Sequence, residues 1–174
     1  MITLLFDTET TGLLLPRTAE LNKQPRIIEL ACIRVENGNV VSEHSWLIDP
    51  ERKLSAEITK ITGLTDADLE GKPKFRQLLP EIEDVFAGCD VLLAHNAPFD
   101  VGMMTTELLL CERTGFPWPK ETVCTVQEYM HLKGRRLKMT QLYEIKMGKK
   151  LEQTHRALDD VRALVEICVK EGIV

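Results

Sequence analysis

The sequence has 174 residues, enough for one domain with a substantial core and too few for two, so we expect a single domain over residues 1–174. Its 44% apolar and 28% charged residues are typical of globular proteins, and no apolar run approaches the roughly 20 residues of a membrane helix, which excludes a transmembrane protein. The net charge of −5 argues against a protein that coats nucleic acid generally.

The first predicted element is a buried strand that ends in two acidic residues. Residues 2–6 are apolar or β-branched, which favours a strand. Asp7 and Glu9 follow two positions apart, so an extended chain places both carboxylates on one face. Two adjacent negative charges are costly unless a cation joins them, and oxygen ligands suit Mg²⁺ or Mn²⁺. The alternative is an ordinary strand end that passes into a polar loop at Gly12.

A β-hairpin is predicted next. Residues 26–35 and 40–48 are rich in β-branched residues and indicate two strands. Asn37 and Gly38 between them tolerate positive φ, which is typical of a two-residue hairpin turn. Glu29 interrupts the apolar pattern of its strand, so we expect its side chain on the solvent side, with a supporting role at a site as the alternative.

The remaining elements alternate between helices and short strands. Residues 55–60 predict a short capped helix, and residues 72–86 carry apolar residues at the helical period. Residues 91–94 and 122–126 predict short strands, and residues 156–170 predict a last amphipathic helix. This order of elements indicates one α/β domain.

Further acidic residues stand at the starts of two helices. A helix over residues 96–113 has Asp100 in its first turn, where a carboxylate can simply complement the helix N-terminus. Asp159 and Asp160 begin the last helix, and taken alone they are ordinary surface residues. His155, just before that helix, is equally compatible with an exposed or capping histidine.

Positive charge is concentrated in residues 130–150. Glu144 is the only acidic residue there, and the segment carries a net charge of +6. Such a basic segment on an acidic chain can bind phosphate groups, and the alternative is a solvated face of a helix. Its cations are Lys133, Arg135, Arg136, Lys138, Lys146, Lys149 and Lys150.

The cysteines indicate a reducing compartment. Five cysteines lie far apart and include no Cys-x-x-Cys pair, so we expect free thiols rather than disulfides or a zinc site. The N-terminus enters a strand directly, without the basic and apolar regions of an export signal. We therefore expect a cytoplasmic protein. The cysteines are Cys32, Cys89, Cys111, Cys124 and Cys168.

Three short motifs occur in a fixed order along the chain. They are Asp-Thr-Glu-Thr-Thr-Gly at 7–12, His-Asn-Ala-Pro-Phe-Asp at 95–100 and His-Arg-Ala-Leu-Asp-Asp at 155–160. Each is weak alone, but together they resemble the exonuclease motifs of the DEDDh, or DnaQ-like, 3′→5′ exonucleases. The resemblance spans nearly the whole chain and is closest to proofreading epsilon subunits of bacterial polymerase III and to free-standing phage-type exonucleases.

The resemblance implies a fold and a metal site. The implied fold is α/β and ribonuclease H-like, with a mixed five-stranded sheet in the order 3-2-1-4-5 and helices on both faces. The implied ligands of two Mg²⁺ or Mn²⁺ ions are Asp7, Glu9, Asp100 and Asp160, and His155 is the implied general base. Asp160 is preferred to Asp159 because the family motif places the aspartate five residues after the histidine.

The resemblance also implies a substrate, the 3′ end of single-stranded or frayed DNA, which is hydrolysed to 5′-mononucleotides. The positions that match the family's nucleotide contacts are Thr8, through backbone amides, and Leu13, Ile61, Thr62 and Phe99. An RNA-trimming exoribonuclease of the same family remains an alternative, as does a module that binds a replicative polymerase. The sequence stops soon after the last predicted helix, so we expect no polymerase-binding tail.

Overall fold

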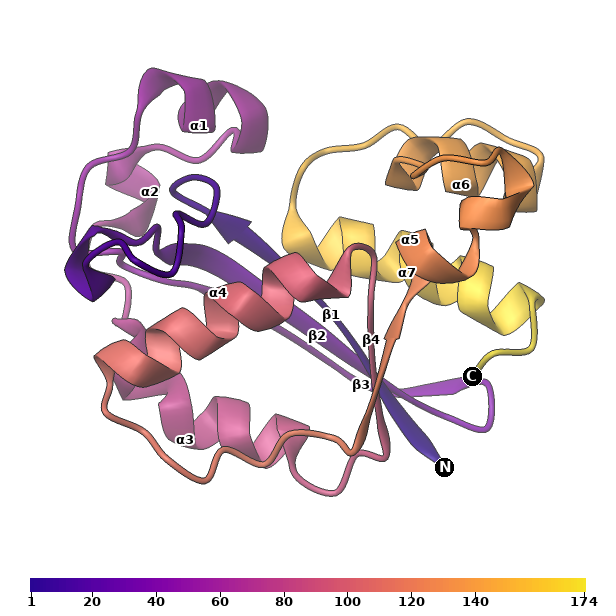
Figure 1. Ribbon diagram of the computed structural model, residues 1–174, viewed down its shortest axis with the longest axis horizontal. Coiled ribbons are helices and arrows are strands. Elements are labelled where there is room, and N and C mark those ends of the chain that lie inside the picture. Colours follow the sequence, from indigo (N-terminus) through magenta and orange to yellow (C-terminus); the bar gives the residue numbers. More distant parts are fainter.

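Five strands form one mixed sheet in the computed structural model, which describes residues 1–174 (Figure 1). The strand order is β3-β2-β1-β4-β5, as the family resemblance implied. The first three strands are antiparallel, whereas β4 runs parallel to β1 and β5 runs parallel to β4. The strands are β1 (Ile2–Thr10), β2 (Ile27–Glu36), β3 (Asn39–Leu47), β4 (Val91–Ala94) and β5 (Glu121–Cys124).

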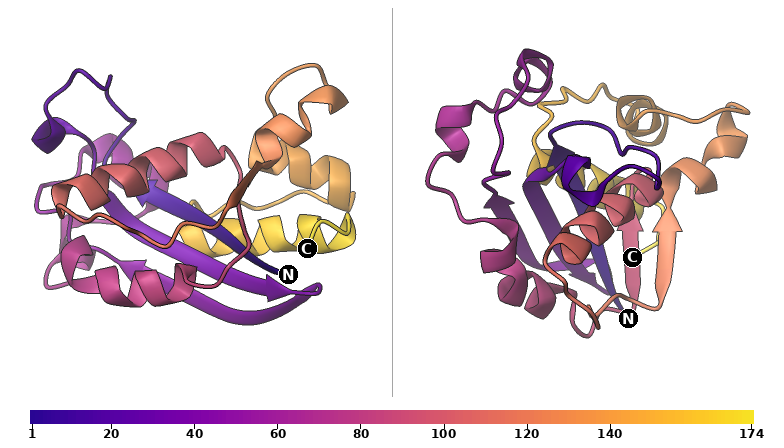
Figure 2. Two further views of the ribbon diagram at one scale, coloured as in Figure 1. Left: turned by 60° about the horizontal axis from the view of Figure 1, so that its bottom comes forward. Right: turned by 60° about the vertical axis from the view of Figure 1, so that its left-hand side comes forward.

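Helices cover both faces of this sheet (Figure 2). α3 and α4 pack on one face, and α6 and α7 pack on the other. The helices are α1 (Ala56–Thr62), α2 (Asp66–Leu69), α3 (Phe75–Phe86), α4 (Ala97–Leu110), α5 (Thr125–Glu128), α6 (Met139–Met147) and α7 (Ala157–Lys170), with 3₁₀ turns at Leu21–Lys23 and Met130–Leu132. None of these helices combines the length and the apolar character that a membrane span requires.

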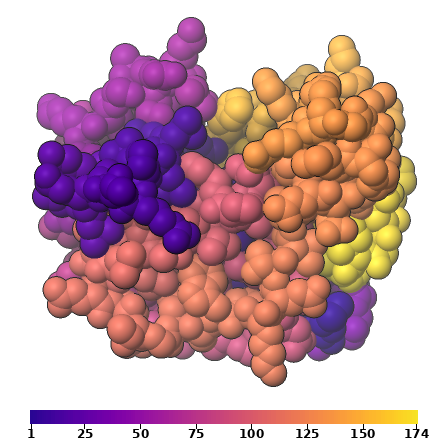
Figure 3. All heavy atoms as spheres, in the orientation of Figure 1, coloured from indigo at the N-terminus to yellow at the C-terminus, as the bar shows by residue number.

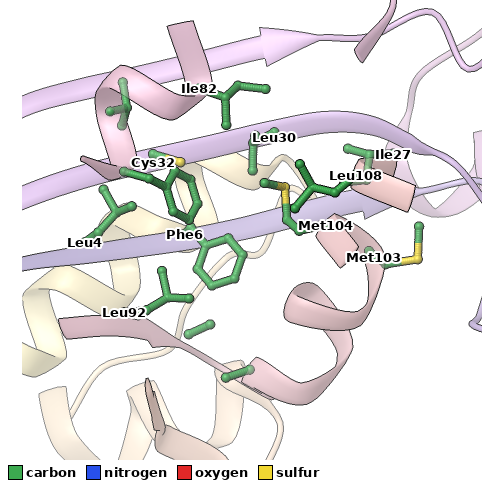
Figure 4. Close-up of a cluster of buried hydrophobic side chains, with 14 of the residues drawn as sticks. Leu4, Phe6, Ile27, Leu30, Cys32, Ile82, Leu92, Met103, Met104 and Leu108 are labelled. Carbon is green, nitrogen blue, oxygen red and sulfur yellow. The ribbon is translucent and has the colours of Figure 1, made fainter. Parts of the chain in front are cut away.

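The alternation of side chains along β1 divides the core into two layers. Leu4 and Phe6 point toward α3 and α4, where the Phe6 ring meets Phe86 edge-on at 6.0 Å between centroids (Figure 4). Leu5 points to the opposite face and packs in the cluster that contains α7. Since side chains alternate with a period of two, Asp7 and Glu9 continue the face of Leu5. The direction of both carboxylates therefore follows from the packing of β1.

The hairpin and two of the caps form as their residues predict. Asn37 and Gly38 both have positive φ, of 50° and 78°, at the turn between β2 and β3. Ser55 caps α1 by accepting a hydrogen bond from the Ile58 N–H, and Gly63 ends that helix with a φ of 72°. The strand predicted over residues 122–126 is shorter, because Thr125 already begins α5.

Candidate functional site

Four carboxylates from three elements meet at the carboxyl end of β1. Asp7 and Glu9 lie on β1 itself. Because β4 pairs parallel to β1, the chain leaves β4 at the same edge of the sheet and enters α4, which has Asp100 in its first turn. Asp160 lies in the first turn of α7, which packs on the face that Asp7 and Glu9 point toward. The topology thus joins three motifs that are far apart in sequence.

His155 lies within this group. One ligand atom each from Glu9, His155 and Asp160 lie within 4.8 Å of one another. The backbone of His155 adopts a φ of 52°, in the left-handed region that non-glycine residues seldom occupy. The segment before α7 therefore directs the imidazole toward the two carboxylates from an exposed position.

Thr8 holds Asp100 beside β1. Its backbone N–H and its hydroxyl both donate to Asp100 Oδ1, at 3.1 and 2.7 Å. Thr8 and Asp100 are both buried. The Thr8 N–H is thus engaged within the fold, and a contact between the backbone amides around Thr8 and a substrate sugar stays a prediction.

Burial and mutual repulsion raise the pKa values of these acids. Burial, followed by the nearby charges of Asp100, Asp160 and Glu9, holds the pKa of Asp7 well above its usual range. Burial and Asp160 raise the pKa of Glu9 to about 8. Burial raises the pKa of Asp100 to about 7, although its hydrogen bonds from Thr8 act in the opposite direction. The cluster is therefore an unfavourable concentration of negative charge.

No lysine or arginine forms an ion pair with any of the four carboxylates. Repulsion among buried anions is relieved either by protons or by a bound cation. The donor set consists of carboxylate oxygens with one imidazole, and oxygen donors are what hard divalent cations prefer. The residues present thus fit a divalent metal centre.

Asp160 and Asp159 have different surroundings. The Gln153 side-chain amide donates to both oxygens of Asp160, at 3.1 and 3.0 Å. Asp159 is exposed, accepts a hydrogen bond from the Thr154 hydroxyl at 2.8 Å and lies 3.7 Å from Arg162. Asp160 therefore faces the cluster and Asp159 faces solvent. Gln153 was not expected at the site, because it carries no motif signal in the sequence.

Glu29 is buried rather than on the solvent side, so that expectation was wrong. It lies opposite Glu9 in the β1–β2 ladder, and the N-terminus of α7 covers it. Its carboxylate accepts from the Arg156 guanidinium, at 2.7 Å from Nη2, and from the Ala157 N–H at 3.1 Å. The sequence feature that indicates this buried role is a charged residue within an otherwise apolar strand. Glu29 thus fixes the start of α7 to the sheet.

The comparison with protein families decides the identity of this site. The model of the RNase T exonuclease family matches residues 4–168, which include all three motifs. The chain belongs to the DEDDh 3′→5′ exonuclease family. It is therefore a 3′→5′ exonuclease, and membership in the family implies divalent metal ions.

The exonuclease has relatives among bacterial replication proteins. It is 33% identical over 163 residues to the DNA polymerase III subunit epsilon of Treponema pallidum, which covers 93% of the chain and 72% of that protein. It is 32% identical over 162 residues to the PolC-type DNA polymerase III of Clostridium perfringens, covering 93% of the chain. The chain spans only 10% of the length of that polymerase.

Solved structures share its fold. Exonuclease X in complex with 5′ overhanging duplex DNA has a TM-score of 0.68 and 25% identity, covering 98% of the exonuclease and 92% of that chain. The nuclease domain of 3′hExo, a DEDDh family member bound to rAMP, has a TM-score of 0.79 and 18% identity, covering 99% and 92%. The second likeness establishes the ribonuclease H-like fold.

His95, from the second motif, has a structural environment. Its Nε2 lies 3.1 Å from the Leu137 carbonyl oxygen, so this nitrogen carries the proton. Nδ1 then accepts from the Thr125 hydroxyl at 2.9 Å. Burial lowers the pKa of His95. The neutral ring joins the end of β4 to α5 and to the segment before α6.

Three of the expected nucleotide contacts are accessible. Leu13 is 80% exposed and Ile61 is 44% exposed, and Phe99 is half-buried. Thr62 is only 2% exposed, and its hydroxyl donates to the Ile58 carbonyl and accepts from the Leu64 N–H. The Thr62 side chain is thus engaged within the fold, and a role of Thr62 in nucleotide binding stays a prediction. The space-filling view shows the surface hollowed between the lobe with the loop after β1 and the lobe with α6 (Figure 3).

Proposed function

We propose that this exonuclease hydrolyses the 3′-terminal phosphodiester bond of single-stranded or frayed DNA and releases 5′-mononucleotides. We assign this activity to one domain, residues 1–174. The observation that carries the proposal is the convergence of four carboxylates without ion-pair partners and one imidazole at the carboxyl end of β1.

The four carboxylates of Asp7, Glu9, Asp100 and Asp160 would hold two Mg²⁺ or Mn²⁺ ions. Such a pair, when bound, makes water nucleophilic at neutral pH and stabilises charge on the leaving 3′-oxygen. Thr8 keeps Asp100 turned toward β1 through two hydrogen bonds, and Gln153 orients Asp160. These contacts would prepare the oxygen ligands before substrate arrives, which reduces the reorganisation that binding requires.

His155 would act as the general base. An imidazole can take a proton from the attacking water near neutral pH. The nearby carboxylates of Glu9 and Asp160 would stabilise the imidazolium that forms. Its exposed position gives the ring access to a water beside the scissile phosphate. General-base assistance of this kind contributes about 10²–10⁴-fold to the rate.

The terminal nucleotide would lie against apolar side chains. Leu13, Ile61 and Phe99 offer accessible apolar surface, which can stack on a base without reading its identity. The hydrogen bonds of Thr62 to Ile58 and Leu64 would fix the turn that ends α1 and so the position of Ile61. These apolar side chains would therefore accept any base at the 3′ end.

The relatives favour DNA as substrate. The Treponema pallidum relative is named as a subunit of DNA polymerase III, and exonuclease X was solved with duplex DNA. The 3′hExo domain was solved with rAMP, so trimming of RNA is the second candidate. We propose a replicative polymerase as a partner, on the names of the relatives alone. The five free cysteines support a reducing, cytoplasmic location.

A time course on labelled strands tests this function. A 5′-labelled DNA strand is expected to shorten one nucleotide at a time, and a 3′-labelled strand is expected to release labelled mononucleotide from the first time point. EDTA should stop both reactions, and Mg²⁺ or Mn²⁺ should restore them. RNA of the same sequence serves as the comparison substrate. Removal of nucleotides from the 5′ end, or internal fragments, would refute the proposal.

A further inference from the structure

Six of the seven positive charges of residues 130–150 fall into two groups in the structure, and the seventh, Lys150, is exposed after α6 without an ion pair. Lys146 pairs with Glu171 on the turn after α7, and its ammonium lies 4.3 Å from the centre of the Tyr129 ring. Lys149 lies 3.5 Å from Glu166. These two lysines therefore serve contacts within the fold, and acidic partners compensate their charge.

The second group lies between the 3₁₀ turn at Met130–Leu132 and α6. All of its side chains are exposed, and none of them forms an ion pair. We call this group the basic strip: Lys133, Arg135, Arg136 and Lys138. Four uncompensated cations within six residues create a local positive potential on a chain with a net charge of −5.

The basic strip is anchored next to the candidate active site. The Leu137 carbonyl within the strip accepts the hydrogen bond from His95 of the second motif, and the Leu137 side chain is buried in the core beneath α7. Arg136 donates to the Asn96 side-chain oxygen at the start of α4, and Asp100 lies in the first turn of that helix. In Figure 1 the orange segment that carries the strip lies beside this end of α4.

We propose that the basic strip binds the backbone phosphates of the nucleic-acid strand upstream of the 3′ end. The inference rests on the proposed function, because it takes the strand that the active site shortens as the ligand. Phosphates are the charged groups that every such strand presents, in DNA and RNA alike, and their neutralisation releases counterions. The strip would hold the strand while Leu13, Ile61 and Phe99 contact successive terminal nucleotides.

The test compares neutralised variants. In the double variant Lys133→Gln/Arg135→Gln, both replaced side chains are exposed, and their only hydrogen bonds run from Arg135 to the Arg136 carbonyl and the Gln141 side chain. Lys120→Gln is the matched control, because Lys120 is exposed without an ion pair and precedes β5, at the opposite end of the sheet from the site. Binding of a DNA strand of about 20 nucleotides is measured in EDTA over a range of salt concentrations, and hydrolysis is measured with Mg²⁺.

The double variant should bind roughly tenfold more weakly near 0.1 M salt, and the slope of log affinity against log salt should fall by about 0.7 for each phosphate that the variant no longer neutralises. The ratio of kcat/KM for the long strand to that for a dinucleotide should fall by a similar factor. The Lys120→Gln control should show the affinity, the salt slope and the kcat/KM ratio of the unmodified protein. An unchanged salt slope would overturn the proposal and would favour an acidic protein as the ligand of the strip.

An equal loss on the dinucleotide and the long strand would also overturn the proposal, because it would indicate damage to the active site. Failure of the proposed function is a separate result. If the unmodified protein hydrolyses neither substrate, the proposed exonuclease activity is wrong. The salt dependence of binding in EDTA still decides whether the strip binds nucleic acid.

Discussion

The carboxylate of Glu29 on β2 holds both the side chain of Arg156 and the N-terminus of α7. Arg156 donates from Nε at 3.0 and 3.2 Å and from Nη2 at 2.7 Å. Because Glu29 pairs with Glu9 in the sheet, this contact sets the third motif in register with the first. The position of His155 and Asp160 relative to Glu9 therefore depends on a residue outside all three motifs.

We predict that Glu29→Ala impairs both stability and turnover. Removal of a buried carboxylate leaves the Ala157 N–H and part of the Arg156 charge without a partner, which costs about 2–4 kcal/mol of unfolding free energy. We expect kcat to fall more than KM rises. Glu29→Gln should recover part of both losses. The exposed Glu43–Arg162 pair, which also joins the sheet to α7, is the control, and Glu43→Gln should cost less than about 1 kcal/mol.

Asp7→Asn should abolish hydrolysis and stabilise the metal-free fold. The variant removes a charge that burial and four neighbouring carboxylates make unfavourable, while the shape of the side chain is kept. We therefore expect a higher Tm than that of the unmodified protein in EDTA, and a smaller rise of Tm on addition of Mg²⁺. Asp159→Asn is the control, because Asp159 faces solvent. Normal turnover by Asp7→Asn would show that Asp7 is no metal ligand.

The stability of the metal-free protein should fall as the pH rises. The pKa values of Glu9 and Asp100, at about 8 and about 7, lie above those of the unfolded chain, so the folded state binds these protons more tightly. Their stabilising effect is complete below the unfolded pKa values and is lost as the pH approaches about 7 to 8. Tm measured in EDTA between these pH values should fall as the pH rises, and a rise of Tm would contradict the prediction. Mg²⁺ should raise Tm most at the alkaline end.

His155→Ala should lower kcat by about 10²–10⁴-fold with little change in DNA affinity measured in EDTA. The imidazole is exposed and has no hydrogen bond within the fold, so the fold should not depend on it. Circular dichroism and Tm provide the control for folding. A large loss of affinity with normal turnover would instead identify His155 as a binding residue.

The neighbouring residues Ile61 and Thr62 are predicted to have different roles, the first in substrate contact and the second in the stability of the fold. Ile61→Ala should raise KM for single-stranded DNA several-fold without a change in Tm, because Ile61 is 44% exposed. Thr62→Val should lower the unfolding free energy by about 1–2 kcal/mol, because the Leu64 N–H loses its acceptor. The reverse pattern in Tm and KM would contradict the assignment of these two positions.

The sequence by itself determined the elements and the directions of side chains relative to them. The spacing of Asp7 and Glu9 places both carboxylates on one side of β1, and Asn37-Gly38 supports the hairpin turn. The order of the three motifs indicated the family, whose known topology supplied the strand order. These features depend on local geometry, in which a period of two or 3.6 residues decides which way a side chain points.

Only the tertiary structure decided what lies against each side chain. Glu29 interrupts an apolar strand, as a solvent-side residue would, yet α7 covers it and its carboxylate binds the start of that helix. Lys146 and the basic strip are equally cationic in sequence, but the turn after α7 supplies an acid only to the former. Burial and ion pairing are contacts between distant segments, so they depend on how helices pack on the sheet, which no local spacing specifies.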